Sequence, residues 1–258
     1  MGIMEKLSLR NKKAIVTGGA TGLGYAMAEA MAQAGANILI ADINLEAGER
    51  AAHSLSLYGT KCIAVYCDVV DEDNAKIAVE TACERLGGLD ILLNNAGICM
   101  HVDSQHMLLS DWQRIMHVNL DGVFIMSKAA AGVMMKNRSG SIVNISSMSG
   151  LIVNTPQNQS AYNASKAGVI HLTKSLATEW APYNIRVNTI APGYMMTRMT
   201  QPIFNEKGEM VKRWMDMSPM KRPGQPDELG GAIVYFASDA SSFTTGAVLP
   251  VDGGYMCW

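Results

Sequence analysis

Short apolar runs rich in β-branched residues recur along the chain and alternate with longer segments of helical periodicity. The runs lie at residues 14–17, 37–41, 61–67, 91–93, 141–145, 185–190 and 247–251. Segments such as 23–34 and 71–86 repeat apolar positions with the period of one helix face. Strands that alternate with helices predict a parallel sheet, and right-handed crossovers then place helices on both faces. The pattern therefore predicts an α/β fold with a doubly wound parallel sheet, in a single domain that spans residues 1–258.

One stretch, residues 197–226, breaks this alternation where the sheet would be closing. It contains methionines and a tryptophan, among them Met199, Met215, Met217, Met220 and Trp214. Flexible thioethers and an aromatic ring suit a mobile lid over an apolar substrate pocket. A helical pair that packs on its own core fits the pattern equally well, so both alternatives stand.

Composition limits the classes of partner. Lys and Arg number 21 and Asp and Glu 23, and this net charge of -2 gives no broad field for nucleic acid or an anionic membrane. No apolar run is long enough to span a membrane, and the N-terminal segment lacks the apolar core of a signal peptide. We therefore expect a soluble, cytoplasmic protein that acts on a small molecule.

The five cysteines are scattered, without a CxxC pair, which argues against a disulfide framework and a zinc site. We expect each cysteine to be a small buried hydrophobic residue. The histidines are also dispersed, so no metal site is predicted.

A glycine-rich loop, TGGATGLG, directly follows the first predicted strand and precedes a helix. Gly18, Gly22 and Gly24 allow a tight turn and a close approach of the backbone to a pyrophosphate, while the helix N-terminus supplies N–H groups and a positive dipole end. Strand before and helix after are the context that a Rossmann-type nucleotide site requires.

Asp42 ends the second strand, 18 residues after Gly24. A carboxylate there accepts hydrogen bonds from the adenosine ribose diol and repels a 2′-phosphate. No basic residue lies in the glycine loop or directly after Asp42 to receive that phosphate, so the sequence predicts NAD rather than NADP as cofactor. The alternative is that Asp42 only caps the next helix.

Tyr162 and Lys166 are four residues apart and share one face of a predicted helix. A nearby ammonium favours a phenolate and so lowers a tyrosine pKa toward the range of a useful base. On the pair alone, a solvated helix face is the simpler interpretation. The rest of the chain changes that balance.

Seven motifs in order resemble those of the short-chain dehydrogenase/reductase family, from Lys13 to Gly254. They are TGGATGLG, CDV at 67–69, NNAG at 94–97, Asn119 in HVNLDGVF, NISS at 144–147, YNASK at 162–166 and PGYMMT at 192–197. The resemblance implies a catalytic set of Asn119, Ser147, Tyr162 and Lys166. In that set Ser147 holds the substrate oxygen, Tyr162 handles the proton, and the residue at Asn119 helps hold a water that links Lys166 to solvent. Ser146, on the opposite side of the strand, is expected to support the backbone.

The resemblance also implies a set of cofactor contacts. Asp68 and Val69 would face the adenine, Asn95 and Ala96 would line the cofactor path, Lys166 would touch the nicotinamide ribose, and Thr197 would meet the nicotinamide amide. The full set is Gly18, Thr21, Gly22, Leu23, Gly24, Asp42, Asp68, Val69, Asn95, Ala96, Gly97, Tyr162, Lys166, Pro192, Gly193 and Thr197.

Three segments are expected to line the substrate pocket, at residues 97–103, 149–159 and 194–204. Their polar groups suit a substrate with several hydroxyls, because a buried hydroxyl needs a partner. We expect substrate contacts from Ser147, Tyr162, His101, Asn154 and Gln159. Residue 162 follows residue 147 by 15 positions, more than is common in the family, and the extra residues fall in the turn-like NTPQNQ.

The C-terminal run from Trp214 resembles polyol and sugar-acid members of the family. It implies interconversion of a sugar alcohol and a ketose, or of a sugar acid and its keto form. The alternatives are a 3-oxoacyl thioester reductase, which Asp42 disfavours, a steroid or small-diol dehydrogenase, and a nucleotide-sensing protein without turnover, which the intact catalytic set disfavours. The family also implies a homotetramer, with the apolar tail at Tyr255, Met256 and Trp258 as a contact; the tail could instead fold over its own sheet.

Overall fold

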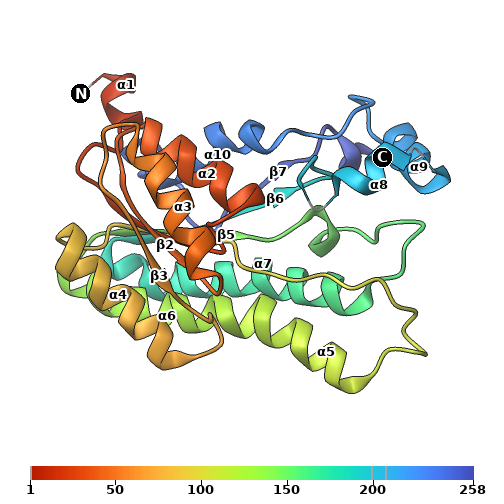
Figure 1. Ribbon diagram of the computed structural model, residues 1–258, viewed down its shortest axis with the longest axis horizontal. Helices are drawn as coiled ribbons and strands as arrows, with labels where there is room; N and C mark the ends of the chain where they lie inside the picture. The colour runs from red at the N-terminus through yellow and green to blue at the C-terminus, as the bar shows by residue number, and fades with distance from the viewer. Residues whose placement is uncertain (1, 199, 207) are drawn as a thin grey trace.

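A single seven-stranded parallel sheet forms the centre of the molecule in the computed structural model, which describes residues 2–198, 200–206 and 208–258 (Figure 1). The strand order is β3-β2-β1-β4-β5-β6-β7. The strands are β1 (Lys13–Thr17), β2 (Asn37–Asp42), β3 (Cys62–Tyr66), β4 (Ile91–Asn94), β5 (Gly140–Ile145), β6 (Ile185–Pro192) and β7 (Val248–Val251). Each lies within two residues of a predicted run, so the predicted fold class is confirmed.

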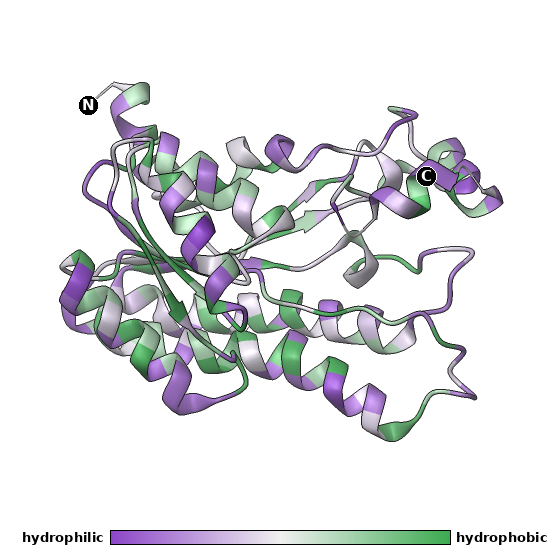
Figure 2. Cartoon of the chain, viewed as in Figure 1, coloured by the Kyte–Doolittle hydropathy of each residue, from purple (hydrophilic) through white to green (hydrophobic). Residues whose placement is uncertain are grey.

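Helices cover both faces of the sheet (Figure 1). One layer consists of α2 (Gly22–Gln33), α3 (Leu45–Ser56) and α10 (Gly230–Ala237), and the other of α4 (Glu72–Leu86), α6 (Gly122–Asn137) and α7 (Ser160–Trp180). Adjacent strand residues serve opposite layers: Ile15 belongs to the core beneath α4 and α6, and Val16 to the core beneath α2 and α10. The strands form an apolar band between the two layers (Figure 2), as expected for a sheet buried on both faces.

The order of the strands reverses at β1 and β4, which are neighbours although two strands separate them in the sequence. Thr17 pairs with Asn94, and Asn94 with Asn144, so the carboxyl ends of β1, β4 and β5 lie level. Asn94 Nδ2 donates to Ser127 Oγ and Asn144 Oδ1, both at 2.9 Å. Ligands of doubly wound sheets bind in the crevice at this switch point, where the predicted motifs gather.

The remaining helical segments are short, and several directly precede or follow a longer helix. They are α1 (Ile3–Leu7), α5 (Leu109–Met116), a π-turn (His117–Asp121), α8 (Gln201–Glu206), α9 (Glu209–Met217) and short 3₁₀ turns at Met148–Gly150, Ala181–Tyr183, Pro226–Leu229, Asp239–Ser241 and Tyr255–Cys257. α5, the π-turn and α6 run on as one helix, Leu109–Asn137, whose hydropathy of 1.2 and length match a membrane span, with 44% of that window buried. α6 packs on α4 and the sheet, so part of this apolar surface belongs to the core.

The predicted lid segment forms α8 and α9, at the same end of the molecule as the chain's C-terminus (Figure 1). Phe204, Val211 and Trp214 form a small apolar cluster separate from the two main cores. The segment thus has an apolar cluster of its own, and its role as a lid stays a prediction. Met199, named above for the lid, lies outside the described residues.

Candidate active site

Tyr162 and Lys166 lie in the first turns of α7, at the carboxyl end of β5. Lys166 is only 3% exposed, so a solvated helix face is the wrong interpretation for it. Its Nζ donates to the carbonyl of Ile145 at 2.9 Å and lies 5.6 Å from the centroid of the Tyr162 ring. The ammonium is therefore held beside the phenol by the last residue of β5.

Ser146 and Ser147 have different partners. Ser146 Oγ donates to the carbonyl of Lys166 at 2.7 Å, which ties β5 to α7. Ser147 caps the 3₁₀ turn Met148–Gly150, because its Oγ accepts from Ser149 N at 3.1 Å. Ser147 is thus the serine placed toward Tyr162. Its hydrogen bond lowers the pKa of Tyr162, although burial raises that pKa more strongly.

Asn119 is fully buried in the π-turn between α5 and α6. Its Nδ2 donates to the carbonyl of Ile98 at 2.9 Å and to Ser165 Oγ at 3.0 Å, and its Oδ1 accepts from Ile98 N at 2.8 Å. Single π-turns inside helices often occur at functional sites. This one fixes the segment after NNAG against the helix that carries Tyr162.

Burial sets the protonation of the pair. It raises the pKa of Tyr162 to about 12, with Cys99 adding to the rise and the Ser147 hydrogen bond opposing it. It lowers the pKa of Lys166 to about 8 against the opposing effect of Cys99. In the chain alone the pKa of Tyr162 therefore lies above its ordinary value and not below it as expected, because burial of the phenol is the largest effect.

The glycine loop has the geometry of a phosphate cradle. Gly18 and Gly22 both have φ of 59°, a left-handed conformation that favours glycine. A Cβ on Gly24 would collide with the carbonyl of Gly18, so α2 starts directly against the loop. Beyond the chain neighbours and the backbone of its own helix, no described atom lies within 4 Å of a Cβ placed on Gly22, and Thr21 makes no side-chain cap on α2. The backbone N–H groups of the loop and of the first turn of α2 thus fit a pyrophosphate.

Asn95 and Thr17 hold this loop in place. Asn95 Nδ2 donates to the carbonyl of Gly18 at 2.9 Å, and Thr17 Oγ1 accepts from Asn95 N and Ala96 N at 3.0 and 3.2 Å. Thr17 was not predicted as a site residue. Its position as the last residue of the first strand, directly before the glycine loop, is the feature of the sequence that could have indicated this role.

Asp42 lies against the glycine loop. Its carboxylate accepts from Ala20 N at 3.1 Å and Asn44 N at 3.0 Å. Asn44, with its Oδ1 accepting from Ala47 N, is the residue that caps α3. The alternative that Asp42 only caps the next helix is therefore wrong.

The other predicted cofactor residues come from neighbouring strand ends. Asp68 and Val69 follow β3, and Asp68 N donates to Asn74 Oδ1 at 3.2 Å. Pro192 ends β6, and a Cβ on Gly193 would lie 2.6 Å from Asp252 Cα, so the ends of β6 and β7 are in close contact. Thr197 Oγ1 lies 3.1 Å from Thr200 Oγ1 in the turn that opens the lid.

The predicted substrate residues differ in their surroundings. His101 is exposed on the segment after NNAG, whereas Asn154 and Gln159 are 4% and 5% exposed. Asn154 Nδ2 donates to Tyr194 Oη at 3.1 Å. Gln159 Nε2 lies within hydrogen-bond distance of Ser149, Asn163 and Asn154. The donors of both amides are thus engaged by the protein itself.

Tyr194 joins the lid to the 151–159 segment. It stacks on Trp214 with ring centroids 4.0 Å apart. Gln157 Nε2 donates to Tyr194 Oη at 2.9 Å, while Trp214 Nε1 donates to Gln157 Oε1 at 3.1 Å. Tyr255 of the tail packs edge-on against the same tyrosine and is 2% exposed, while Trp258 is 81% exposed. The tail therefore folds onto the lid side, where Tyr255 is buried and the exposed Trp258 donates from Nε1 to the carbonyl of Met217 at the end of α9.

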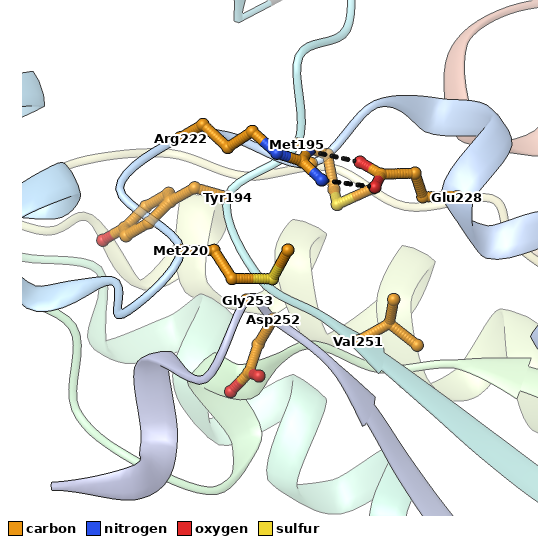
Figure 3. Close-up of a pocket in the computed structure, with 9 residues that line it drawn as sticks. Tyr194, Met195, Met220, Arg222, Glu228, Val251, Asp252 and Gly253 are labelled. Carbon is orange, nitrogen blue, oxygen red and sulfur yellow. Dashed lines mark hydrogen bonds and ion pairs between the residues drawn. The ribbon is translucent and has the colours of Figure 1, made fainter.

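A pocket beside this tyrosine is lined by Met195, Met220 and Val251 and flanked by an ion pair (Figure 3). Arg222 donates to both carboxylate oxygens of Glu228 at 2.7 Å, and this holds the pKa of Glu228 at about 2. None of the four predicted catalytic residues lines it. The pocket is therefore not the reaction centre.

Cysteine burial was predicted only in part. Cys67 is buried, Cys62 and Cys83 are half-buried, and Cys99 and Cys257 are exposed. The expectation that every cysteine is buried is wrong for the last two. Cys99 lies on the open segment after NNAG, within the electrostatic reach of Tyr162 and Lys166.

Comparison with known proteins gives consistent matches over the whole chain. The profile of a family described as enoyl-(acyl carrier protein) reductase matches residues 18–256. Sorbose reductase of Candida albicans is 40% identical over 99% of this chain and 90% of that protein. A probable NADP-dependent mannitol dehydrogenase of Yarrowia lipolytica is 40% identical over 99% of this chain and 91% of that protein. A ribulose-forming D-arabinitol 2-dehydrogenase of Candida tropicalis is 41% identical over 99% of this chain and 96% of that protein. The crystal structure of gox2181 is 44% identical with a TM-score of 0.96, covering 99% of both chains.

Proposed function

The chain belongs to the short-chain dehydrogenase/reductase family, and from this premise we propose that it interconverts a sugar alcohol and its ketose, or a sugar acid and its keto form, with NAD(H). Family membership makes it an oxidoreductase that uses a nicotinamide dinucleotide. One observation carries the proposal: Ser147, Tyr162 and Lys166 come together at the carboxyl end of β5, two strands from β1, whose carboxyl end carries the glycine loop.

In alcohol oxidation, the nicotinamide supplies the hydride acceptor. Ser147 donates a hydrogen bond to the substrate oxygen and keeps it beside Tyr162. Tyr162 Oη takes the hydroxyl proton and returns it in ketone reduction. Lys166 favours the phenolate through its charge, and Asn119 keeps the segment after NNAG and the start of α7 in register through Ile98 and Ser165.

Asp42 supports NAD as the cofactor. Its carboxylate faces the loop where the adenosine ribose of such folds lies, and it would accept from the ribose hydroxyls and repel a 2′-phosphate. A similar protein is described as NADP-dependent, so both cofactors belong in the test.

Substrate support comes from the names of the similar proteins, which include sorbose, mannitol and arabinitol enzymes. Of the predicted substrate contacts, Ser147, Tyr162 and His101 remain proposed contacts. We propose that α8 and α9 form a lid, because Tyr194 and Trp214 connect them to the 151–159 segment beside Ser147.

Assembly as a homotetramer is proposed from the outer surface of the long helix. Phe124 is 45% exposed on α6, in a helix whose apolar window is only 44% buried. A partner subunit would cover this surface. We place the protein in the cytoplasm, where its five free thiols would stay reduced.

The decisive experiment measures NADH formation by the purified protein with sorbitol, mannitol, galactitol, arabinitol, xylitol and gluconate, with NADP run in parallel. The proposal expects turnover of one polyol or sugar acid and a higher kcat/KM with NAD. No turnover with any member of this panel, together with reduction of a 3-oxoacyl thioester or a steroid ketone, would show that the proposed substrate class is wrong. A higher kcat/KM with NADP would contradict the role of Asp42.

A further inference from the structure

A chain of buried side chains leads from α7 to the proposed substrate-holding serine. Gln159 Nε2 donates to Ser149 Oγ at 3.1 Å, and Ser147 Oγ donates to Ser149 Oγ at 3.0 Å. Ser147 and Ser149 are 9% and 5% exposed, and Gln159 is 5% exposed. Water is thus largely excluded, and these groups depend on one another for their hydrogen bonds.

The number of lone pairs limits what each hydroxyl can do. A serine hydroxyl has one hydrogen and two acceptor positions. Ser149 Oγ accepts from both Gln159 and Ser147, so beside a neutral Tyr162 the hydrogen of Ser147 is directed to Ser149 and not to a substrate. Only a Tyr162 phenolate would draw that hydrogen to its own oxygen, and this is the hydrogen bond that lowers the pKa of Tyr162. Ser147 Oγ in turn accepts from Ser149 N at 3.1 Å, which fixes its rotamer whichever way its hydrogen points.

We propose that Gln159 and Ser149 are positioning residues that form a reversible hydrogen-bond relay to Ser147. When a substrate oxygen arrives, the Ser147 hydrogen turns to it, and the Ser149 hydroxyl turns to donate to Ser147 Oγ. Ser147 then accepts two hydrogen bonds and donates its only hydrogen to the substrate. Gln159 keeps donating to Ser149 in both states. The Ser149 hydroxyl therefore cannot use its hydrogen on the Gln159 nitrogen, and that hydrogen stays free to turn to Ser147 Oγ.

This inference rests on the proposed function only in its use of Ser147 as the group that holds the substrate oxygen. It changes the role of Gln159 from a substrate contact to a residue that acts through Ser149. The relay strengthens the donor just when negative charge develops on the substrate oxygen, so it affects kcat more than KM.

The test compares Ser149→Ala, Ser149→Thr, Gln159→Glu and Asn163→Asp. Ser149→Ala keeps the backbone donor but removes the hydroxyl, and we expect kcat to fall about five- to tenfold with KM within about twofold. Ser149→Thr restores the hydroxyl and returns kcat to within about twofold of the wild type. Equal losses in both variants would overturn the relay.

Gln159→Glu replaces the donor with a carboxylate that accepts from Ser149 and so leaves the Ser147 hydrogen on Ser149. We expect a loss larger than that of Ser149→Ala at pH 8, and recovery relative to the wild type as the pH falls and the carboxyl regains its proton. Asn163→Asp is the matched control, because it adds the same charge at the atom that accepts from Gln159 at 2.9 Å while Gln159 remains a donor. Equal pH-dependent recovery of both variants would contradict the relay.

The kinetic assays use whichever alcohol or ketone the wild type turns over fastest, so a wrong polyol assignment is recognised in the wild type before any variant is measured. Neutron diffraction of the wild type provides a readout without substrate. The relay expects deuterium on Gln159 Nε2 and on Ser147 Oγ, both directed to Ser149 Oγ. An amide with its oxygen facing Ser149 would overturn the proposal even if the polyol activity is found.

Discussion

At the scale of single residues, the proposed reaction depends on two ionisable groups that burial moves in opposite directions. The pKa of Tyr162 is raised to about 12 and that of Lys166 lowered to about 8, in both cases first by desolvation. Each shift disfavours the charged form. The free protein therefore holds a neutral phenol beside an ammonium that is still mostly protonated at neutral pH.

Tyr162→Phe tests the proton-transfer role. The change removes only the hydroxyl, so we expect kcat to fall by about three orders of magnitude or more, while the dissociation constant for NADH changes by less than about threefold. Steady-state rates and NADH fluorescence titration measure the two quantities. Activity that survives in this variant would rule out Tyr162 as the proton acceptor.

The pH dependence should differ between the two directions. Alcohol oxidation requires the phenolate, whose fraction increases as the pH rises toward the Tyr162 pKa of about 12, so its rate should increase from pH 6 to pH 10. The increase should weaken above about pH 8, where Lys166 loses its charge. Ketone reduction requires the phenol and should not gain over this range. Initial rates in both directions provide the check, and an oxidation optimum below pH 7 would contradict it.

At the scale of elements, the site depends on a close contact between the 3₁₀ turn Met148–Gly150 and α7. A Cβ on Gly150 would lie 2.6 Å from the backbone carbon of Lys166 and 2.7 Å from its oxygen. Only a residue without a side chain lets the turn that carries Ser147 lie this near the helix of Tyr162. Sequence reasoning missed Gly150, although it stands three residues after Ser147.

Gly150→Ala should therefore separate Ser147 from Tyr162. We expect a loss of about 1 to 3 kcal/mol in the free energy of unfolding, as for other overpacked sites, and a kcat at least tenfold lower. Gly231→Ala is the matched control, because Gly231 is exposed in the first turn of α10 and a Cβ there meets no described atom within 4 Å beyond its chain neighbours and its own helix backbone. It should leave kcat unchanged and stabilise the helix slightly. Denaturant unfolding and kcat measure both variants; equal behaviour would show that the contact has no role in the site.

At the scale of the whole molecule, the outer surface of the helix Leu109–Asn137 distinguishes a monomer from an assembly. The sheet and α4 cover its inner side, while Phe124 remains 45% exposed in the single chain. Burial of such a ring contributes about 1.5 to 3 kcal/mol. A second copy of the chain is the partner that a homotetramer supplies.

Light scattering of the wild type should give the mass of a tetramer, and Phe124→Glu should shift the protein to smaller species by placing a charge in the interface. Leu57→Glu is the control, since Leu57 is 79% exposed at the end of α3, in the opposite helix layer. It should leave the mass unchanged. A wild-type mass equal to that of one chain would contradict the proposed assembly.

Most of the fold was predictable, because strand and helix periodicities are local and the glycine loop, Asp42 and the pair Tyr162 and Lys166 have fixed spacings in the chain. Contacts between segments that are distant in the sequence could not be predicted from this local pattern. The π-turn that buries Asn119, the closeness of Gly150 to Lys166, and the engagement of Asn154 and Gln159 by neighbouring side chains each join residues from different elements.

The sequence alone thus determined the order of the strands and helices, the nucleotide loop and the chemical type of the site residues, since these depend on residue identity and spacing. The tertiary structure decided their environment. It set the pKa values of Tyr162 and Lys166 by desolvation, assigned the capping of α3 to Asn44 rather than Asp42, and directed the amide of Gln159 to Ser149. Burial and hydrogen-bond partners come from packing between elements, which the one-dimensional pattern does not encode.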